Sequence, residues 1–140
     1  MKPWLAAVQI TGLLIVAGGC SVPAAARTPP MASDVLAIPA DLPTQRLFDC
    51  AETSIAQLSE TSSSWPNVTR KDAANGVLES GDFEDANRSG FRMRIERAQG
   101  ASQARIALKG AGAYFADLGV AQAMQDLKTA LGSCIATPPR

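Results

Sequence analysis

Apolar residues recur at helical spacing in two stretches of the chain, separated by a region with a different pattern. The first stretch lies between residues 44 and 60, and its apolar stripe consists of Leu47, Ala51, Ile55 and Leu58. The second follows Asp117, and its stripe consists of Val120, Met124, Leu127 and Leu131. Because residues three and four apart share one face of a helix, both stretches are predicted to be amphipathic helices.

Residues suited to helix ends flank both stretches. Asp41 or Thr44 is a candidate N-cap for the first helix, and Asp117 is one for the second. Pro138 and Pro139 follow the second helix, and proline cannot continue a helix from within. We therefore expect the last helix to end close to the end of the chain.

Between the helices the pattern changes to alternation. From residue 91 to 96, Phe91, Met93 and Ile95 alternate with polar residues, and residues 104–109 repeat the pattern. Residues 76–83 are a plausible further strand, ending at the turn-rich segment 84–90. Alternation places apolar side chains on one face of a strand, so we expect an antiparallel meander with one buried and one wet face.

Two segments remain ambiguous at this stage. Val68 and Thr69 suit a short strand, but residues 69–72 equally suit a capped helical turn. Residues 110–119 suit either an edge strand or a loop. The sequence thus predicts an α+β fold in which an antiparallel sheet of three to four strands carries the N- and C-terminal helices on one face.

The remaining pattern divides the chain into four parts. Residues 1–19 have the layout of a signal peptide, and residues 20–42 are rich in proline and alanine without a sustained period. We expect the second part to be a semi-extended tether. Residues 43–136 then form a single domain, and residues 137–140 form a tail.

The N-terminal part has a charged start at Lys2 followed by a mostly apolar core from Leu5 to Ala17. Small residues come next, as they do before a signal-peptide cleavage site. The alternative is a retained transmembrane helix, but spanning a bilayer takes roughly 20 apolar residues. This run is shorter and ends in glycines, so cleavage is the better interpretation.

The segment Val16-Ala17-Gly18-Gly19-Cys20 resembles the lipobox of bacterial lipoproteins, although Ala17 stands where that family most often has leucine. The resemblance covers only residues 1–20. It implies that the Cys20 thiol is lipidated, with acyl chains such as palmitate, and becomes the mature N-terminus. Several chains on one residue would anchor the protein stably. Ser21 resembles the outer-membrane sorting pattern, which implies a location on the periplasmic side of the outer membrane if the source has two membranes.

Composition narrows the possible partners. The formal net charge of the 140 residues is zero, so no overall charge attracts nucleic acid. The chain contains no histidine, the usual general base near neutral pH and the commonest transition-metal ligand. We expect no cofactor and no nucleic-acid partner.

Lipidation of Cys20 would leave Cys50 and Cys134 as a pair in a compartment that permits disulfides. Each lies on the apolar stripe of its helix. Four strands between the helices would make the helices antiparallel and bring these cysteines together, whereas three strands would separate them. A bridge therefore favours a fourth strand, near Val68 or near Tyr114. The alternative is two buried free thiols.

Candidate catalytic groups do not assemble into a known pattern. The acidic residues of segment 79–85 lack the spacing of a calcium loop, and a solvated hairpin end explains them more simply. Ser62, Ser63 and Ser64 have no histidine to activate them. Lys109 precedes rather than follows the glycines of residues 110–112, unlike the lysine of a phosphate loop. We expect the protein not to be an enzyme.

The wet face of the sheet is the remaining candidate site, and its basic residues are Arg92, Arg94, Arg105 and Lys109. These residues suit a platform for an anionic envelope partner, such as a lipopolysaccharide phosphate or an acidic protein surface. The simpler alternative is cross-strand salt bridging with Glu79 and Glu96 on an ordinary exposed face.

Three aromatic residues, Trp65, Tyr114 and Phe115, are expected in the core or at its rim. Together these patterns predict a membrane-anchored, non-catalytic accessory module that interacts with an envelope protein. The alternative is a ligand-binding or inhibitor module that uses the basic face for an anionic envelope component such as a glycolipid.

Overall fold

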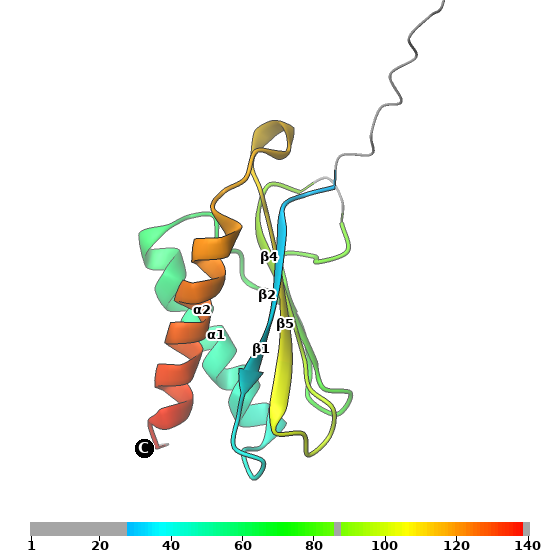
Figure 1. Ribbon diagram of the computed structural model, residues 1–140, viewed down its shortest axis with the longest axis vertical. Coiled ribbons are helices and arrows are strands. Elements are labelled where there is room, and N and C mark those ends of the chain that lie inside the picture. Colours follow the sequence, from blue (N-terminus) through cyan, green and yellow to red (C-terminus); the bar gives the residue numbers. More distant parts are fainter. Residues whose placement is uncertain (1–27, 86–87, 139–140) are drawn as a thin grey trace, which may run out of the picture.

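The computed structural model describes residues 28–85 and 88–138. This part of the chain forms a five-stranded antiparallel sheet with two helices on one face (Figure 1). In chain order the elements are β1 (Met31–Ala37), α1 (Thr44–Thr61), β2 (Val68–Asp72), β3 (Val77–Ser80), β4 (Gly90–Glu96), β5 (Gln103–Ala111), the 3-10 turn η1 (Ala113–Phe115) and α2 (Val120–Ala136). The predicted signal peptide and Cys20 lie outside the described residues.

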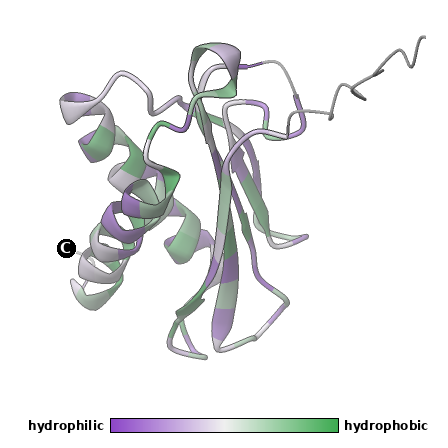
Figure 2. Ribbon diagram, turned by 45° about the horizontal axis from the view of Figure 1, so that its top comes forward, coloured by the Kyte–Doolittle hydropathy of each residue, from purple (hydrophilic) through white to green (hydrophobic). Residues whose placement is uncertain are grey.

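The predicted α+β class is confirmed, and both helices pack on the same face of the sheet. The sheet order is β1-β5-β4-β3-β2, so every neighbouring pair except β1 and β5 is also consecutive in the chain. The core lies between the helices and the sheet and is built from the predicted stripes and alternating positions. Its largest fully buried apolar side chains are Leu47, Phe48, Leu78, Met93, Ile95, Ile106, Leu108, Leu127 and Leu131. Along the strands, hydrophilic bands interrupt hydrophobic ones, as one apolar and one polar face require (Figure 2).

The sheet has five strands rather than three or four, because one further strand is added at each edge of the predicted meander: β2 at one edge and β1 at the other. Residues 68–72 form β2, so the strand interpretation of this segment is correct and the helical turn is wrong. Residues 110–119 divide: β5 continues to Ala111, and a loop follows. At β3 the predicted strand 76–83 is too long, since Gly81 and Asp82 take left-handed φ values of 67° and 53°.

Strand β1 corrects the predicted tether, because residues 31–37 pair with β5 at the edge of the sheet. The sequence of this strand does not alternate between apolar and polar residues, because Asp34 is polar although it faces the helices. Its carboxylate is satisfied there by the Lys128 ammonium of α2, 2.5 Å away. The prolines that suggested a tether flank β1 rather than interrupt it: Pro29 and Pro30 precede it and Pro39 follows. The folded domain therefore begins by Met31.

The predicted disulfide is confirmed: Cys50 and Cys134 are bonded, with their Cα atoms 5.6 Å apart. Four strands separate the helices, which run antiparallel, so the early part of α1 lies beside the end of α2 (Figure 1). The bridge closes a span of 84 residues, which in the chain-entropy description stabilises the fold by about 4.5 kcal/mol. Of the two proposed positions for the fourth strand, the one near Val68 is correct.

Helix starts differ from the predicted caps. Neither Asp41 nor Thr44 caps α1, whose N-cap position is occupied by Pro43 without a side-chain hydrogen bond. Asp117 does serve α2, although Gly119 occupies the N-cap position. The Asp117 carboxylate accepts hydrogen bonds from the Gly119 and Val120 amides, at 2.9 and 3.0 Å, which satisfies donors that a helix start leaves unpaired.

A buried arginine that sequence reasoning missed secures the end of the sheet nearest the C-terminus. Arg97 is only 4% exposed. Its guanidinium donates to the Ala101 carbonyl at 2.9 Å and to the Leu42 carbonyl, and so joins the β4–β5 turn to the connection between β1 and α1.

Among the helices within residues 28–85 and 88–138, none is long and apolar enough to cross a membrane.

Candidate functional site

The candidate site is the face of the sheet that the helices leave uncovered, which we call the open face. The strand register arranges its residues in three rows. From β1 towards β2 the rows are Met31, Lys109 and Arg92; then Ser33, Ala107, Arg94, Glu79 and Arg70; then Val35, Arg105, Glu96, Val77 and Asp72. All four predicted basic residues therefore share one face, but acidic residues are interleaved with them.

Arg94 occupies the centre of the open face and is paired with two carboxylates. Its guanidinium lies 2.5 Å from a carboxylate oxygen of Glu79 on β3, and it also contacts Glu84 from the loop after that strand. The hydrogen bond from Arg94 lowers the pKa of the Glu84 carboxyl. Here the salt-bridged alternative of the sequence analysis is correct, and the charge of Arg94 is locally neutralised.

Residues 81–85 turn back over the open face and bring an aromatic ring onto it. Phe83 is 6% exposed, and two cations lie close to the centre of its ring: the Arg94 guanidinium carbon at 4.6 Å and the Lys109 ammonium at 4.1 Å. The ammonium also donates a hydrogen bond to the Phe83 carbonyl, at 2.8 Å. Burial lowers the pKa of the Lys109 ammonium, and the nearby charge of Arg92 lowers it further.

Arg92 is the exception among these cations. It was predicted on a wet face, but it is 1% exposed, so that prediction is wrong. The segment after β3 covers it: a Cβ atom added at Gly81 would lie 3.1 Å from Arg92 Cγ. Within the described residues, none of its three guanidinium nitrogens has a hydrogen-bond partner. Burial lowers the pKa of this guanidinium, while the nearby charge of Asp85 partly opposes the shift.

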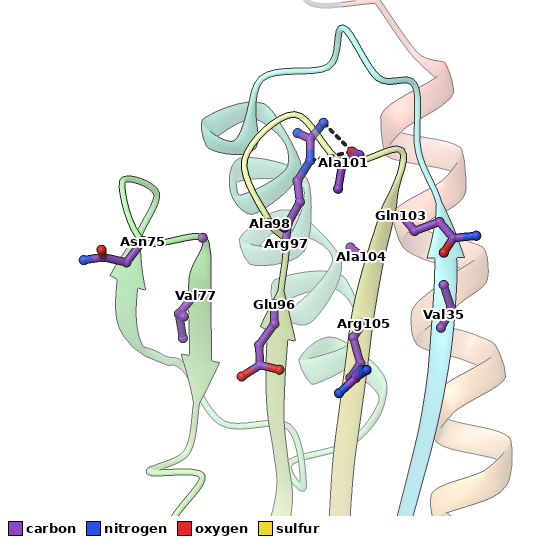
Figure 3. Close-up of a pocket in the computed structure, with 11 residues that line it drawn as sticks. Val35, Asn75, Val77, Glu96, Arg97, Ala98, Ala101, Gln103, Ala104 and Arg105 are labelled. Atoms are coloured by element: carbon purple, nitrogen blue, oxygen red, sulfur yellow. Dashed lines mark hydrogen bonds between the residues drawn. The ribbon is translucent and has the colours of Figure 1, made fainter.

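Arg105 lies in a different setting, at the opposite end of the open face. It is exposed, and in the register it neighbours Glu96 on β4. The two project from adjacent strands into a shallow groove of about 510 Å³, with Val77 and Val35 flanking them (Figure 3). At this end of the face one acid and one base therefore lie on adjacent strands, with a valine on either side.

The acidic residues of segment 79–85 form ion pairs with arginines and do not form a metal-binding cluster. The Arg88 guanidinium lies 3.0 Å from the Asp82 carboxylate and 3.2 Å from that of Asp85. Among residues 28–85 and 88–138, no group of three cysteine, aspartate or glutamate side chains is placed to hold a metal ion. The segment forms a charged, ion-paired loop.

Of the three aromatic residues expected in the core or at its rim, Trp65 and Phe115 meet the expectation and Tyr114 does not, Phe115 being partly buried. Trp65 is buried as expected, and its ring packs 4.7 Å from that of Phe91. Tyr114 is 90% exposed, so its expected place in the core or at its rim is wrong. The reason is local: Tyr114 and Phe115 both have left-handed φ values, 55° and 61°, which turn this segment out of the strand.

Phe83 and Tyr114 are two residues of interest that sequence reasoning placed wrongly. Phe83 was assigned to the end of a strand, although the glycine before Asp82 was a signal for a turn. No sequence signal marked the outward direction of Tyr114, because left-handed aromatic residues are rare.

No protein-family model matches the chain, and no curated protein matches it in sequence.

Proposed function

We propose that the chain is a lipid-anchored accessory module of the bacterial cell envelope, which binds a partner protein rather than transforming a substrate. The observation that carries the proposal is the Cys50–Cys134 disulfide. Disulfides persist mainly in oxidising compartments, so the bond favours an exported protein. It also accounts for two of the three cysteines and leaves Cys20, the residue that ends the lipobox-like segment.

The short distance in sequence between Cys20 and β1 supports this arrangement. Strand β1 begins at Met31, so eleven residue steps separate the anchor from the sheet. A fully extended chain of this length spans roughly 40 Å. The domain would therefore stay close to the membrane, and Ser21 favours the periplasmic side of the outer membrane.

The anchor can be tested by labelling cells with an alkyne analogue of palmitate in a bacterial host with two membranes. The wild-type chain should take up the label and fractionate with membranes. Cys20→Ala should lose the label and either leave the membrane or remain uncleaved. The double variant Cys50→Ala with Cys134→Ala is the matched control and should keep the label. Equal labelling of Cys20→Ala would rule out the anchor.

The partner surface can be tested by placing a photo-crosslinking residue at Arg105, in the groove of the open face. The control position is Gln125, which is exposed on α2 on the other side of the molecule. A discrete crosslinked envelope protein from position 105 alone would support the accessory function. The same product from both positions, or none from either, would contradict it.

A second candidate function is favoured by Arg92 alone. A buried arginine with unused donors is uncommon, and a phosphate or carboxylate is the group that a guanidinium binds best. We propose, as the alternative, that the open face binds an anionic envelope component that reaches Arg92 beside the segment 81–85. Lys109 lies next to Arg92 across the register and would add a second cation.

This alternative predicts that Arg92→Met abolishes calorimetric binding of purified lipopolysaccharide, while Arg105→Gln preserves it. Methionine keeps the volume of the buried position without the charge, and Arg105 is a cation on the same face but in another setting. Absence of binding by the wild-type protein, or equal binding by both variants, would refute this candidate without affecting the accessory function.

A further inference from the structure

The loop between β5 and α2 projects one aromatic side chain away from the domain. The Gly112 amide donates to the Ala116 carbonyl at 2.7 Å, and the Leu118 amide donates to the Gly110 carbonyl at 3.2 Å. These bonds close the loop at its base and tie it to the end of β5. Tyr114 is left at the tip, 90% exposed.

The backbone at this tip is unusual for the residues that occupy it. Tyr114 and Phe115 are consecutive and both left-handed, a region that residues with a bulky Cβ substituent rarely occupy. Such conformations persist where the surrounding structure enforces them, and they concentrate at functional sites. In this loop the consequence is an outward tyrosine where an inward one would add to the core.

Other exposed apolar side chains lie at the same end of the domain. Leu118 is 37% exposed and belongs to the loop, and Met31 is 57% exposed at the start of β1. The carbonyl of Pro30 accepts a hydrogen bond from the Gly110 amide, 2.9 Å away. The chain therefore enters the sheet beside the base of the loop. η1 protrudes at this end, whereas the β4–β5 turn and the end of α2 lie at the other (Figure 1).

The entry point of the chain determines which end an anchor would hold near the membrane. The eleven residue steps from Cys20 to Met31 span roughly 40 Å at most. This segment enters the domain at the end that carries Tyr114, and not at the opposite end, where Arg97 lies. A tyrosine combines an apolar ring with a polar hydroxyl, the combination that is enriched where lipid tails meet headgroups.

We propose that the loop 112–118 is the membrane-contacting surface of the domain and that Tyr114 inserts at the interface of the bilayer that holds Cys20. This inference rests on the proposed lipid anchor and extends it, since it names the end of the domain that touches lipid. The contact is apolar rather than electrostatic, because loop 112–118 contains no basic residue and the nearby Arg88 is paired with Asp82 and Asp85. The acid of the loop, Asp117, accepts hydrogen bonds from the start of α2. The contact should therefore depend little on salt.

The test uses the acylated mature chain, which begins at Cys20 and therefore lacks Trp4, reconstituted into vesicles of phosphatidylethanolamine and phosphatidylglycerol, with and without brominated phospholipid. Tyr114→Trp places a reporter at the loop tip, and Gln99→Trp places a matched reporter in the exposed turn at the opposite end. We expect a shift of emission to shorter wavelength and strong quenching by brominated lipid from position 114 only. Wild-type protein supplies the baseline from Trp65, which is buried.

The possible outcomes separate this inference from the anchor. An acylated Cys20 with an unquenched position 114, or with equal quenching at 114 and 99, overturns the inference and leaves the anchor intact. Absence of acylation overturns both. A photo-crosslinker at position 114 should capture lipid in cells, and capture of a protein in place of lipid would overturn the membrane contact. Thermal unfolding of each variant checks that Tyr114→Trp and Gln99→Trp fold like the wild type.

Discussion

The two faces of the sheet are made by the same strands but held by different interactions. Towards the helices, apolar side chains are fully buried and a disulfide joins the two helices that cover them. On the open face, ion pairs, one aromatic ring and a buried cation replace the apolar core. Burial of apolar area stabilises a fold, whereas unpartnered polar groups oppose it. The helix-covered face therefore supplies stability. The open face retains polar groups that do not stabilise the fold, so we expect them to be retained for binding.

The strongest way to sharpen this comparison is to remove the disulfide from the helix-covered side. Replacing Cys50 and Cys134 by alanine should lower the free energy of unfolding by about 4 kcal/mol, since the unfolded chain regains the freedom of a long loop. Urea titration followed by circular dichroism measures the loss. Reductant should destabilise the wild type by a similar amount and leave the double variant unchanged. A loss below about 1 kcal/mol would contradict the assigned role of the bond.

The second test concerns the buried arginine that is satisfied. Arg97→Ala should cost about 2 kcal/mol, because it leaves carbonyls of the β1–α1 connection and the β4–β5 turn without donors. The measurement is the same urea titration. Arg105→Ala is the matched control, since that side chain is exposed, and it should change stability by less than about 0.5 kcal/mol.

The third test predicts an increase in the free energy of unfolding and addresses the contrast between the two faces of the sheet directly. Arg92→Met should stabilise the domain by about 1 kcal/mol, because it removes a buried cation without hydrogen-bond partners among the described residues. Thermal unfolding should show a higher midpoint than the wild type. A destabilised Arg92→Met protein would mean that Arg92 is well accommodated, and the distinction between the two faces would fail at this position.

The smallest expected effect is a pH dependence at the edge of the sheet. The hydrogen bond from Lys128 lowers the pKa of Asp34. A carboxyl whose pKa is lower in the folded state stabilises the fold above its unfolded pKa, and the contribution disappears as the pH falls through the folded pKa. Asp34→Asn should therefore flatten the loss of stability below about pH 4. Urea titrations at a series of pH values measure the slope, and an unchanged slope for Asp34→Asn would contradict this contribution.

The helix-covered face was predictable from sequence to a large extent. Helical stripes and alternation depend on burial against a single core, so α1, α2, β4 and β5 were predicted within a few residues. The disulfide then favoured a fourth strand between the helices, near Val68 or near Tyr114, and the first of these positions is β2. Strand β1 escaped prediction because its inward position 34 is an aspartate, and an ion pair across to α2 leaves no mark in a local pattern.

The open face was much less predictable. Its four basic residues were placed on one face correctly, since alternation alone decides that. Their environments depend on the segment 81–85, which folds back through two left-handed residues and covers Arg92 with Phe83 close by. Such a turn is determined by backbone conformation rather than by periodicity. The outward direction of Tyr114 escaped prediction for the same reason.

The pairing of β1 with β5 also bears on the order in which the domain can form. Met31 is aligned with Lys109, so β1, the first strand of the described residues, finds its only strand neighbour in the described sheet near the other end of the domain. Contacts between distant segments form late, because closing a long loop costs entropy before any contact is made. A newly made chain therefore keeps its first strand unpaired until β5 has been synthesised. If the chain is exported as proposed, this delay would keep β1 without its strand partner while the chain crosses the membrane.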